Sequence, residues 1–305
     1  MTSATLTDDL VTTKVTVWMR FRRHRLAIAG AVVLSLLVLS AVFSGILSPY
    51  DPNFIDNVHW QGNPLPPCFQ DATQCGGHVL GSDELGRDLL SRLLFGARIS
   101  LQVGIYTVLV ELAIGVVLGA LAGYYGGWID WLLMRLTDVF LSIPLLPLLL
   151  VLTGIVAASS NKAALSFWVI VLIIGLLSWP AVARLVRASF LSLREREFAE
   201  AARAVGNNDV RIIFRHLLPN AMAPIIVQAT LDVANIIILE SVLSYLGFGI
   251  QPPTASWGNM LVNAQANLSV AWWAAVFPGL AILLTVLSIN YIGDGLRDAL
   301  DPNMR

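Results

Sequence analysis

The stretch that decides the fold is LAIAGAVVLSLLVLSAVFSGIL, residues 26–47, in which no side chain is charged. As a helix, at about 1.5 Å per residue, it covers the roughly 30 Å hydrocarbon core of a bilayer. A signal peptide has an apolar core of only about 7–15 residues, so this stretch is predicted to stay in the protein as a first membrane span. The alternative is a buried helix of a soluble core.

Outward from this stretch, the whole chain is apolar. Of its 305 residues, 56% are hydrophobic and 13% are charged, and the mean hydropathy is +0.73. Soluble domains carry about 25% charged residues. Runs long enough to span recur at 26–48, 100–124, 131–156, 166–185, 220–246 and 272–293. Six such runs argue against a soluble core and predict an all-α integral membrane protein with about six transmembrane helices.

The basic residues orient these spans. Most of the 19 lysines and arginines fall in a basic N-terminal segment, 1–25, in the segment 184–218 and in the C-terminal tail. Cytosolic loops are enriched in Lys and Arg, so these three segments and both termini are predicted to be cytosolic. The residues then left outside are Arg87, Arg92, Arg98 and Lys162.

The largest outer loop is 49–99. Its first half is rich in Pro, Asn and Asp and is predicted to be irregular, whereas Ser82–Leu101 has leucines at helical spacing and predicts an amphipathic helix on the outer face. The remainder, 100–305, is predicted to form a membrane core with one long cytosolic loop, 186–219. Aromatic rings expected at the outer membrane interface are Trp257, Trp272 and Trp273.

Both cysteines, Cys68 and Cys75, lie in the outer loop. On the oxidising side of a bacterial membrane, two cysteines separated by six residues can close a disulfide, which we favour over free thiols. A metal site would need more ligands. His59 and His78 lie nearby, but the spacing matches no standard zinc pattern, and no metal site is predicted.

Glycines and prolines mark several spans. Gly115, Gly119 and Gly123 recur every four residues and share one helix face, where a neighbouring helix can approach closely. That face serves either ordinary packing or a gate or subunit contact. Prolines within spans either shape a cavity or hinge, or only curve the helix; they are Pro144, Pro147, Pro180, Pro224 and Pro278.

The most informative polar segment is RASFLSLREREFAEAARAVGNNDVRIIFRHLLPN, residues 187–220. Its first part is rich in strong helix formers, and Gly206 is predicted to end that helix. The Asn and Asp residues at 207–209 can cap a second helix, Val210–Leu218, before Pro219 begins the next span. Small side chains at Ala201, Ala202 and Ala204 suit insertion into a groove on a partner, although a connector that covers the membrane surface has the same composition.

This segment resembles a known motif. Glu200-Ala201-Ala202, then Gly206, then Leu218-Pro219 is similar to the EAA loop of ABC importer permeases. The general pattern has an isoleucine two residues before Leu-Pro, where this chain has His216. The resulting His-Leu-Leu-Pro-Asn resembles the peptide and nickel branch of the family.

Three more segments resemble the C-type permease subunit of dipeptide, oligopeptide and nickel ABC importers: His78–Gly104, Glu240–Gly258 and Gly293–Pro302. The resemblance runs from about Arg20 to Pro302. It implies a type I ABC importer permease, multi-pass in the bacterial cytoplasmic membrane, that translocates di- or oligopeptides. Nickel or another small solute is the alternative substrate within the same branch.

The resemblance also implies partners and a coupling surface. The partners are a homologous second permease subunit, one or two ABC ATPase subunits and an extracytoplasmic substrate-binding protein, within the lipid bilayer. ATP and Mg would bind the ATPase subunits, and no cofactor is expected on this chain. Residues expected to couple this chain to the ATPase are Glu200, Ala201, Ala202, Gly206, Asn207, Asp209, His216 and Pro219.

An enzymatic role is not predicted, because neither Lys14 nor Lys162 follows a glycine as a P-loop lysine does. Nucleic-acid binding is not expected either, since membrane orientation explains the basic residues. The rival class is an ion-coupled secondary transporter, in which acids within spans would carry ions; those acids are Glu111, Asp138, Asp232 and Glu240. Asp138 could instead pair with Arg135 on the same helix. The loop motif favours the ABC permease.

Overall fold

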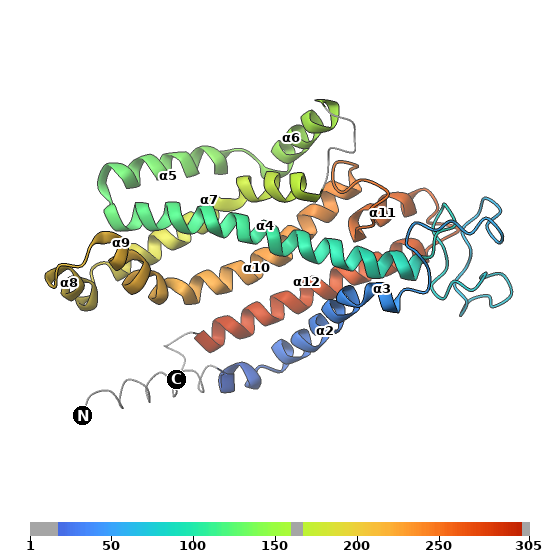
Figure 1. Ribbon diagram of the computed structural model, residues 1–305, viewed down its shortest axis with the longest axis horizontal. Helices are drawn as coiled ribbons and strands as arrows, with labels where there is room; N and C mark the ends of the chain where they lie inside the picture. Colours follow the sequence, from blue (N-terminus) through green and yellow to red (C-terminus); the bar gives the residue numbers. More distant parts are fainter. Residues whose placement is uncertain (1–17, 160–166, 301–305) are drawn as a thin grey trace.

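The computed structural model describes residues 18–159 and 167–300, and helices make up most of this part of the chain (Figure 1). In chain order, the elements are α2 Arg25–Val42, α3 Ser44–Leu47, α4 Leu89–Tyr125, α5 Gly127–Ser142, α6 Leu145–Ser159, α7 Phe167–Leu193, α8 Glu197–Ala204, α9 Asp209–Arg211, the π-helical segment η2 Ile212–Leu217, α10 Leu218–Tyr245, α11 Trp257–Gln265 and α12 Trp273–Leu300.

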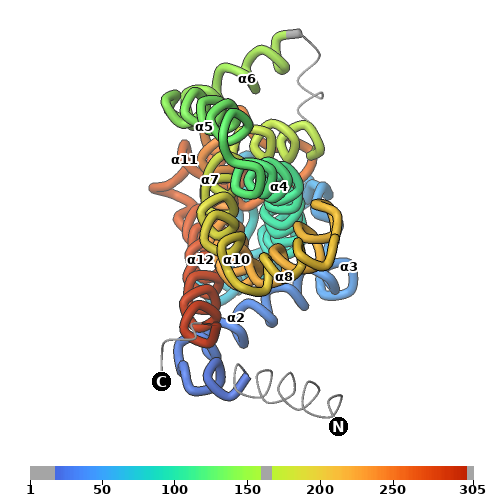
Figure 2. The backbone as a smooth tube through the Cα atoms, turned by 90° about the vertical axis from the view of Figure 1, so that its left-hand side faces the viewer, coloured from blue at the N-terminus to red at the C-terminus, as the bar shows by residue number. Residues whose placement is uncertain are grey.

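The described helices confirm the prediction of an all-α membrane protein. Five are long and apolar enough to cross a membrane: α2, α4, α7, α10 with the residues before it, and α12. A sixth span results if α5 and α6, which are bent by 82° relative to each other, count as one. Seen from the α8 end, α4, α7 and α10 lie at the centre, with α5 and α6 on one side and α2 on the other (Figure 2).

The segments predicted to be cytosolic from their basic residues lie at one end of the bundle, and the predicted outer loop lies at the other. The short helices α8 and α9, the beginning of α2 and the end of α12 lie toward one end, while the long loop after α3 and the helix α11 lie toward the other (Figure 1). This arrangement agrees with cytosolic termini and with a cytosolic loop between α7 and α10. Residues of the orientation argument that lie outside the described part are Lys14, Lys162 and Arg305.

The prediction of an amphipathic helix over Ser82–Leu101 is wrong for its first seven residues. Helix α4 begins at Leu89 and runs for 37 residues without a break, so its outer part is an extension of the second span. Asp88 caps it, because its Oδ2 accepts a hydrogen bond of 2.7 Å from the Ser91 amide. Before the cap, Ser82 pairs with Asp88 in an antiparallel bridge, so this segment is a loop.

Predicted glycines hold α4 against α7; they are Gly115, Gly119 and Gly123. A Cβ on Gly119 would lie 2.4 Å from the carbonyl oxygen of Ala183, which is far inside van der Waals contact. Helix α7 contributes Gly175, where a Cβ would lie 2.8 Å from the Cβ of Val110. The glycine face therefore packs within the chain, as small residues do between membrane helices.

The third span is broken at a proline. Ile143 has extended dihedral angles, φ −95° and ψ 126°, because the ring of Pro144 disfavours a helical residue before it. Helix α6 therefore turns away from α5, forming an elbow that is visible in Figures 1 and 2. We call Ile143, Pro144 and Leu145 the elbow.

Ion pairs hold α5 along α7. Arg187 binds Asp130 with two nitrogen atoms, and Arg184 Nη2 donates to Asp138 Oδ1. The predicted pair within α5 is present but longer, with 3.7 Å between Arg135 Nη1 and Asp138 Oδ2. Asp138 is thus neutralised chiefly from the neighbouring helix.

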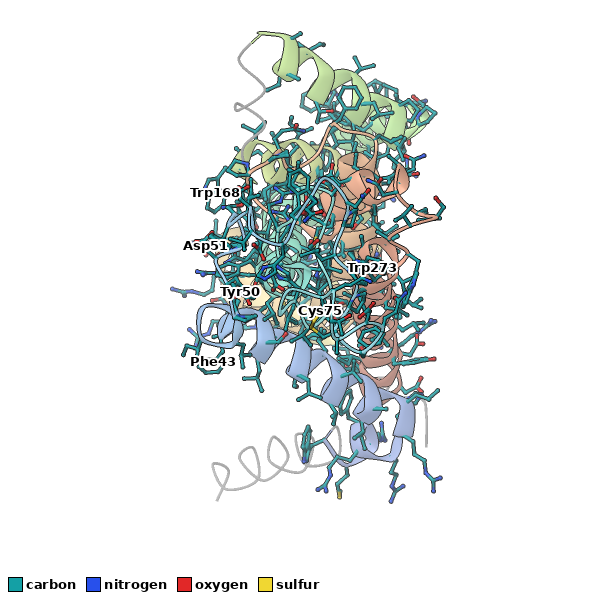
Figure 3. All side chains as sticks on the ribbon, turned by 90° about the vertical axis from the view of Figure 1, so that its right-hand side faces the viewer. Phe43, Tyr50, Asp51, Cys75, Trp168 and Trp273 are labelled. Carbon is teal, nitrogen blue, oxygen red and sulfur yellow. A yellow bond between two sulfur atoms is a disulfide. The ribbon has the colours of Figure 1, made fainter. Side chains whose placement is uncertain are left out.

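A loop of irregular structure covers the outer end, as predicted for its first half. Figure 3 looks onto this end, where Tyr50, Asp51 and Cys75 are labelled. Cys68 and Cys75 form a disulfide in the structure. The aromatic prediction is wrong for two of three rings. Trp257 is fully buried and its Nε1 donates to the Leu93 carbonyl at 3.1 Å, and Trp273 is 3% exposed.

A buried histidine organises this loop. His78 is 1% exposed, its Nδ1 lies 2.9 Å from Asp88 Oδ1, and its Nε2 lies 3.4 Å from Asp56 Oδ2. The hydrogen bond to Asp88 raises the pKa of His78 above its ordinary value of 6.5, against the opposing effect of burial, and Asp56 raises it further. The imidazolium thereby links the irregular loop to the cap of α4.

This shift predicts a pH-dependent stability of the outer loop. Because the pKa of His78 is raised in the folded state, its contribution to the free energy of unfolding is complete below about pH 6.5. This contribution is lost as the pH rises through the folded-state pKa. The melting temperature of the solubilised protein should therefore fall as the pH rises above about 6.5, and His78→Gln should melt lower at acidic pH without that fall. His59→Gln, at an exposed imidazole beside Asp56, is the matched control and should keep the fall. A pH profile of His78→Gln equal to that of the wild type would contradict the assignment.

Candidate functional site

The inner loop between α7 and α10 has two arms joined at a glycine. Helix α7 continues to Leu193, α8 follows at Glu197–Ala204, and α9 begins at Asp209. Gly206 between the arms has φ +81°, a left-handed conformation that residues with a Cβ rarely adopt. No atom lies within 4 Å of the position of a Cβ there, so the need for glycine is conformational and not steric. The predicted turn at Gly206 is present.

Asparagines hold the turn. Asn208 is the N-cap of α9, and its Oδ1 accepts a hydrogen bond of 3.0 Å from the Arg211 amide. Asn207 donates from Nδ2 to the Ala202 carbonyl at 3.1 Å, which closes the end of α8. The two asparagines therefore stabilise the turn between the arms through hydrogen bonds within the loop.

The second arm is not a separate helix, contrary to the prediction for Val210–Leu218. It runs through η2 directly into α10, and the Leu218 amide donates to the carbonyl of Ile213, five residues earlier. Pro219 has no amide hydrogen for the helical bond to Arg215, and the wider π turn occupies these residues. A movement of the arm thus passes into the fifth span without an intervening loop.

The predicted coupling residues divide between two faces. Ala202 is 7% exposed and packs with Ala199 against the inner ends of the spans, so its predicted place on an exposed face is wrong. Of the other seven, two are half-buried, Asn207 and His216. The remaining five are exposed: Glu200, Ala201, Gly206, Asp209 and Pro219. The inward face of α8 holds the loop, and only the outward face is free for a partner.

Apolar side chains on the exposed side of this loop were not predicted from the sequence. Val205 is 83% exposed, Val210 62% and Phe214 58%, although all three lie at the cytosolic end of the molecule. We call Ala201, Val205, Val210 and Phe214 the loop tip. Apolar side chains exposed beside a fixed turn are typical of a surface that another protein covers. Helical spacing alone assigns such residues to a core, so no local pattern marks them as exposed.

Contacts with α4 anchor the loop to the spans. Tyr124, near the inner end of α4, donates from its hydroxyl to Asp209 Oδ1 at 2.7 Å, and the guanidinium of Arg203 lies 5.7 Å from its ring centroid. Arg194 Nη1 donates to the Gly123 carbonyl at 3.2 Å. Both arms therefore contact the same end of α4.

A cavity of about 350 Å³ lies within the bundle at the elbow. Its walls come from α4, α5, α6, α7 and α10, and two of the predicted intramembrane acids, Glu111 and Asp232, line it. The other two are elsewhere. Asp138 pairs with Arg184, and Glu240 accepts hydrogen bonds from Ser244 and Ser256, which holds the start of α11.

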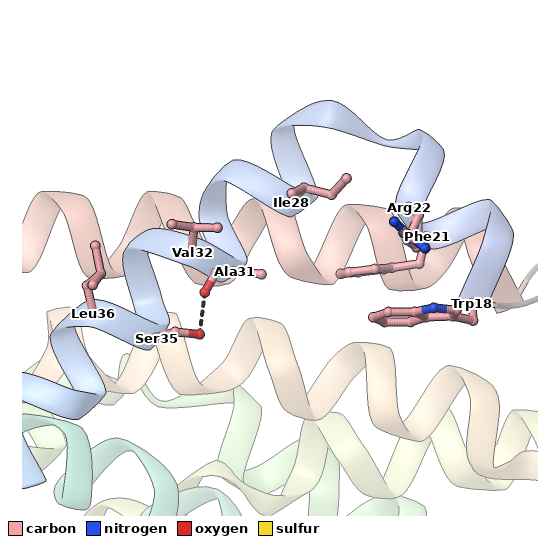
Figure 4. Close-up of a pocket in the computed structure, with 8 residues that line it drawn as sticks. All are labelled: Trp18, Phe21, Arg22, Ile28, Ala31, Val32, Ser35 and Leu36. Carbon is pink, nitrogen blue, oxygen red and sulfur yellow. Dashed lines mark hydrogen bonds between the residues drawn. The ribbon is translucent and has the colours of Figure 1, made fainter.

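Two further cavities open on the surface. One, of about 420 Å³, lies along α2 and is lined by Trp18, Phe21, Arg22, Ile28, Ala31, Val32, Ser35 and Leu36 (Figure 4). Its walls are almost wholly apolar, as expected of a groove on a lipid-facing helix. The other, of about 410 Å³, lies at the outer end and is lined by Pro52, Asn53, Phe95, Arg98, Ile99, Gln102, Pro253, Thr254 and Ala255.

Two family models match the sequence. Residues 115–305 match the binding-protein-dependent transport system inner membrane component, and residues 15–67 match the N-terminal TM domain of oligopeptide transport permease C. The two matches together include the first span and the inner loop.

Proteins similar to the chain over 94% of its length include three transport permeases. The dipeptide transport system permease protein DppC of Alkalihalophilus pseudofirmus is 40% identical, with 88% of that protein covered. The glutathione transport system permease protein GsiD of Pectobacterium atrosepticum is 42% identical, with 90% covered. The di/tripeptide transport system permease protein DppC of Pseudomonas aeruginosa is 41% identical, with 91% covered.

Among solved structures, the fold is similar to that of a chain from the MetNI methionine ABC transporter in inward-facing conformations. One crystal form has a TM-score of 0.54 at 17% sequence identity, covering 69% of this chain and 97% of that chain. A second crystal form also has a TM-score of 0.54, at 20% identity, covering 68% of this chain and 96% of that chain. At these identities the likeness concerns the fold.

Proposed function

The chain belongs to the family of binding-protein-dependent transport system inner membrane components, and from this premise we propose that it is a peptide-translocating permease subunit of an ATP-driven importer. It is a multi-pass protein of the cytoplasmic membrane. The observation that carries the proposal is the inner loop, with a fixed turn at Gly206 and apolar side chains exposed beside it.

The loop supplies the means of coupling to an ATPase subunit. Its outward face, with the loop tip, docks in a cleft of that subunit, and its inward face packs on the ends of α4, α7 and α10. When ATP binding moves the cleft, both arms move with it, and η2 transmits the movement into α10. The chain itself has no P-loop lysine, so ATP and Mg belong to the ATPase subunits.

Peptide is the substrate class that the relatives support, since their names specify dipeptide, di/tripeptide and glutathione transport. A binding protein delivers the substrate at the outer end, where the loop 49–88 lies, together with the cavity of about 410 Å³ that Arg98 helps to line. A second, homologous permease completes the pathway, and alternating access follows from different ATPase contacts in the two states.

Cysteine cross-linking tests the docking face. The chain has two cysteines, both in the outer-end disulfide, so a cysteine introduced in the inner loop supplies a unique thiol. Ala201→Cys and Val205→Cys should form disulfides with a cysteine in the ATPase cleft, with a yield that changes when ATP is added. Ala202→Cys, one residue from Ala201 but buried, is the matched control and should react weakly.

Two results would count against the proposal. One is equal yield from Ala201→Cys and Ala202→Cys, which would mean that the loop does not dock by its outward face. The other is peptide uptake that persists without any ATPase subunit and follows the proton gradient. That result would support an ion-coupled transporter, the rival that the intramembrane acids raise.

A further inference from the structure

The elbow cavity contains two carboxylates at the same depth in the bundle. Glu111 lies on α4 about 21 Å from Tyr125, and Asp232 lies on α10 about 21 Å from Leu218, taking about 1.5 Å per helical residue. Both therefore lie well inside a hydrocarbon core about 30 Å thick. Carboxylates at this depth are costly and are functional candidates by default.

Protein contacts do not neutralise this pair. Glu111 is 2% exposed, and within the described residues no hydrogen-bond partner reaches its Oε2. Asp232 accepts hydrogen bonds of 2.9 and 3.1 Å from the neutral amide of Gln228, and it is close enough to Glu111 for the two to interact electrostatically. Among the described residues that line the cavity, none carries a positive charge.

Of the other two intramembrane acids, only Asp138 is paired with a cation, and Glu240 also has an Oε2 that no hydrogen-bond partner reaches within the described residues. Asp138 has the guanidinium of Arg184, and Glu240 has the hydroxyls of Ser244 and Ser256 on one oxygen. Neither of them lines the elbow cavity. The pair Glu111 and Asp232 is thus set apart by its place on the cavity wall, where none of the described lining residues is a cation.

The rest of the cavity wall is mainly apolar. Phe140 and Leu141 come from α5, the elbow supplies Ile143, Pro144 and Leu145, and Leu239 comes from α10. A volume of about 350 Å³ falls within the range of small-molecule sites and far exceeds that of a bare ion. The cavity therefore suits an organic molecule with a positive group and apolar side chains. Two carboxylates are few for a hard metal ion, which takes six or more oxygen ligands.

We propose that Glu111 and Asp232 receive the N-terminal ammonium group of a peptide as it passes the elbow. This inference rests on the proposed function and names the part of the substrate that the cavity recognises. The ammonium donates hydrogen bonds to the free Oε2 of Glu111 and to Asp232, and such charge-assisted bonds are the strong ones. The apolar walls accept the first side chains without selecting among them.

Photoaffinity labelling of the purified complete complex tests the proposal without the binding protein, which has its own selectivity. The probe is Ala-Ala-benzoylphenylalanine, compared with its N-acetylated form. We expect about tenfold more labelling of this chain by the free amine, because acetylation removes the charge and a donor. Glu111→Gln and Asp232→Asn should each lower the labelling by the free amine to the level of the acetylated probe.

Matched variants and probes sharpen the result. Asp294→Asn, which removes an exposed carboxylate at the inner part of α12, should leave the labelling unchanged. An N-acetylated probe ending in lysine separates an N-terminal ammonium from a side-chain ammonium; strong labelling by it would overturn the assignment to the N-terminus. If Glu111→Gln fails to assemble, the labelling of Asp232→Asn alone tests the proposal, because Asp232 is only half-buried.

Equal labelling by the free and acetylated probes, or unchanged labelling in the assembled acid variants, would overturn the proposal. The proposed function is measured separately, as ATP-dependent uptake of trialanine by wild-type complex and binding protein in proteoliposomes. Uptake without amine-selective labelling refutes only the inference. No ATP-dependent uptake by the wild type refutes the proposed function.

Discussion

Replacing Gly206 by valine is expected to abolish ATP-driven peptide uptake while the chain remains in the membrane. Valine at φ +81° is strained by more than the roughly 1–2 kcal/mol of a left-handed residue, because its β-branch restricts the backbone further. The turn opens, and the two arms no longer present the loop tip at a fixed angle. Uptake and ATP hydrolysis measured in the same proteoliposomes should show hydrolysis that no longer depends on the loaded binding protein.

Gly247→Val is the matched control for strain as such. Gly247 has φ +84°, and no atom lies within 4 Å of its Cβ position, but it follows α10 at the opposite end of the molecule. It carries the same conformational penalty away from the ATPase, so it should lower stability and keep uptake coupled to hydrolysis. Normal coupled uptake in Gly206→Val would show that the turn is not needed for docking.

Replacing Gly119 by alanine is expected to leave little folded protein. The new Cβ would lie 2.4 Å from the carbonyl oxygen of Ala183, and backbone of two long helices cannot yield as a flexible side chain does. Overpacking usually costs about 1–3 kcal/mol, and a backbone contact this short belongs at or above the upper limit. The amount of monodisperse protein after extraction, and its melting temperature, should both fall.

Two glycines supply graded controls for this packing. At Gly104, also on α4, the nearest atom to a Cβ is Ile237 Cγ1 at 2.9 Å, a side-chain atom that can move, so Gly104→Ala should cost less. Gly279 on α12 has no atom within 4 Å, and Gly279→Ala should be neutral or slightly stabilising through helix propensity. Equal melting temperatures for all three variants would contradict close packing of α4 on α7.

The inner loop shows how far local sequence can predict a site. The turn at Gly206 and the cap at Asn208 could be predicted because a left-handed glycine and a capping amide act within a few residues. The burial of Ala202 and the exposure of Val205 could not, since they depend on which side of α8 meets the spans. Docking of this loop on an ATPase stays a prediction.

The outer loop shows the opposite case, in which pattern misled. Leucines at helical spacing predicted an amphipathic helix from Ser82. In the structure, the polar residues of this segment instead form ion pairs and a helix cap with one another. Asp83 binds Arg87 at 2.7 Å and lies 3.4 Å from Arg92, and Asp88 caps α4. Trp257 and Trp273, expected in the interface, instead hydrogen-bond to the Leu93 and Ser82 carbonyls. The carbonyls that accept from the two tryptophans are distant along the chain, so no local period predicts these contacts.

The sequence by itself determined that the chain crosses a membrane about six times and which side its inner loop faces. The spans follow from free energies of transfer and the orientation follows from the distribution of Lys and Arg, and both depend on the composition of each segment and little on its neighbours. Only the tertiary structure decided which of the four intramembrane acids pairs with a cation and which of them line a cavity. Arg184 lies 46 residues from Asp138, and Glu111 and Asp232 come from different helices. Electrostatic interactions between such groups depend on distances in space, and packing of the glycine faces and the bend at Pro144 set those distances.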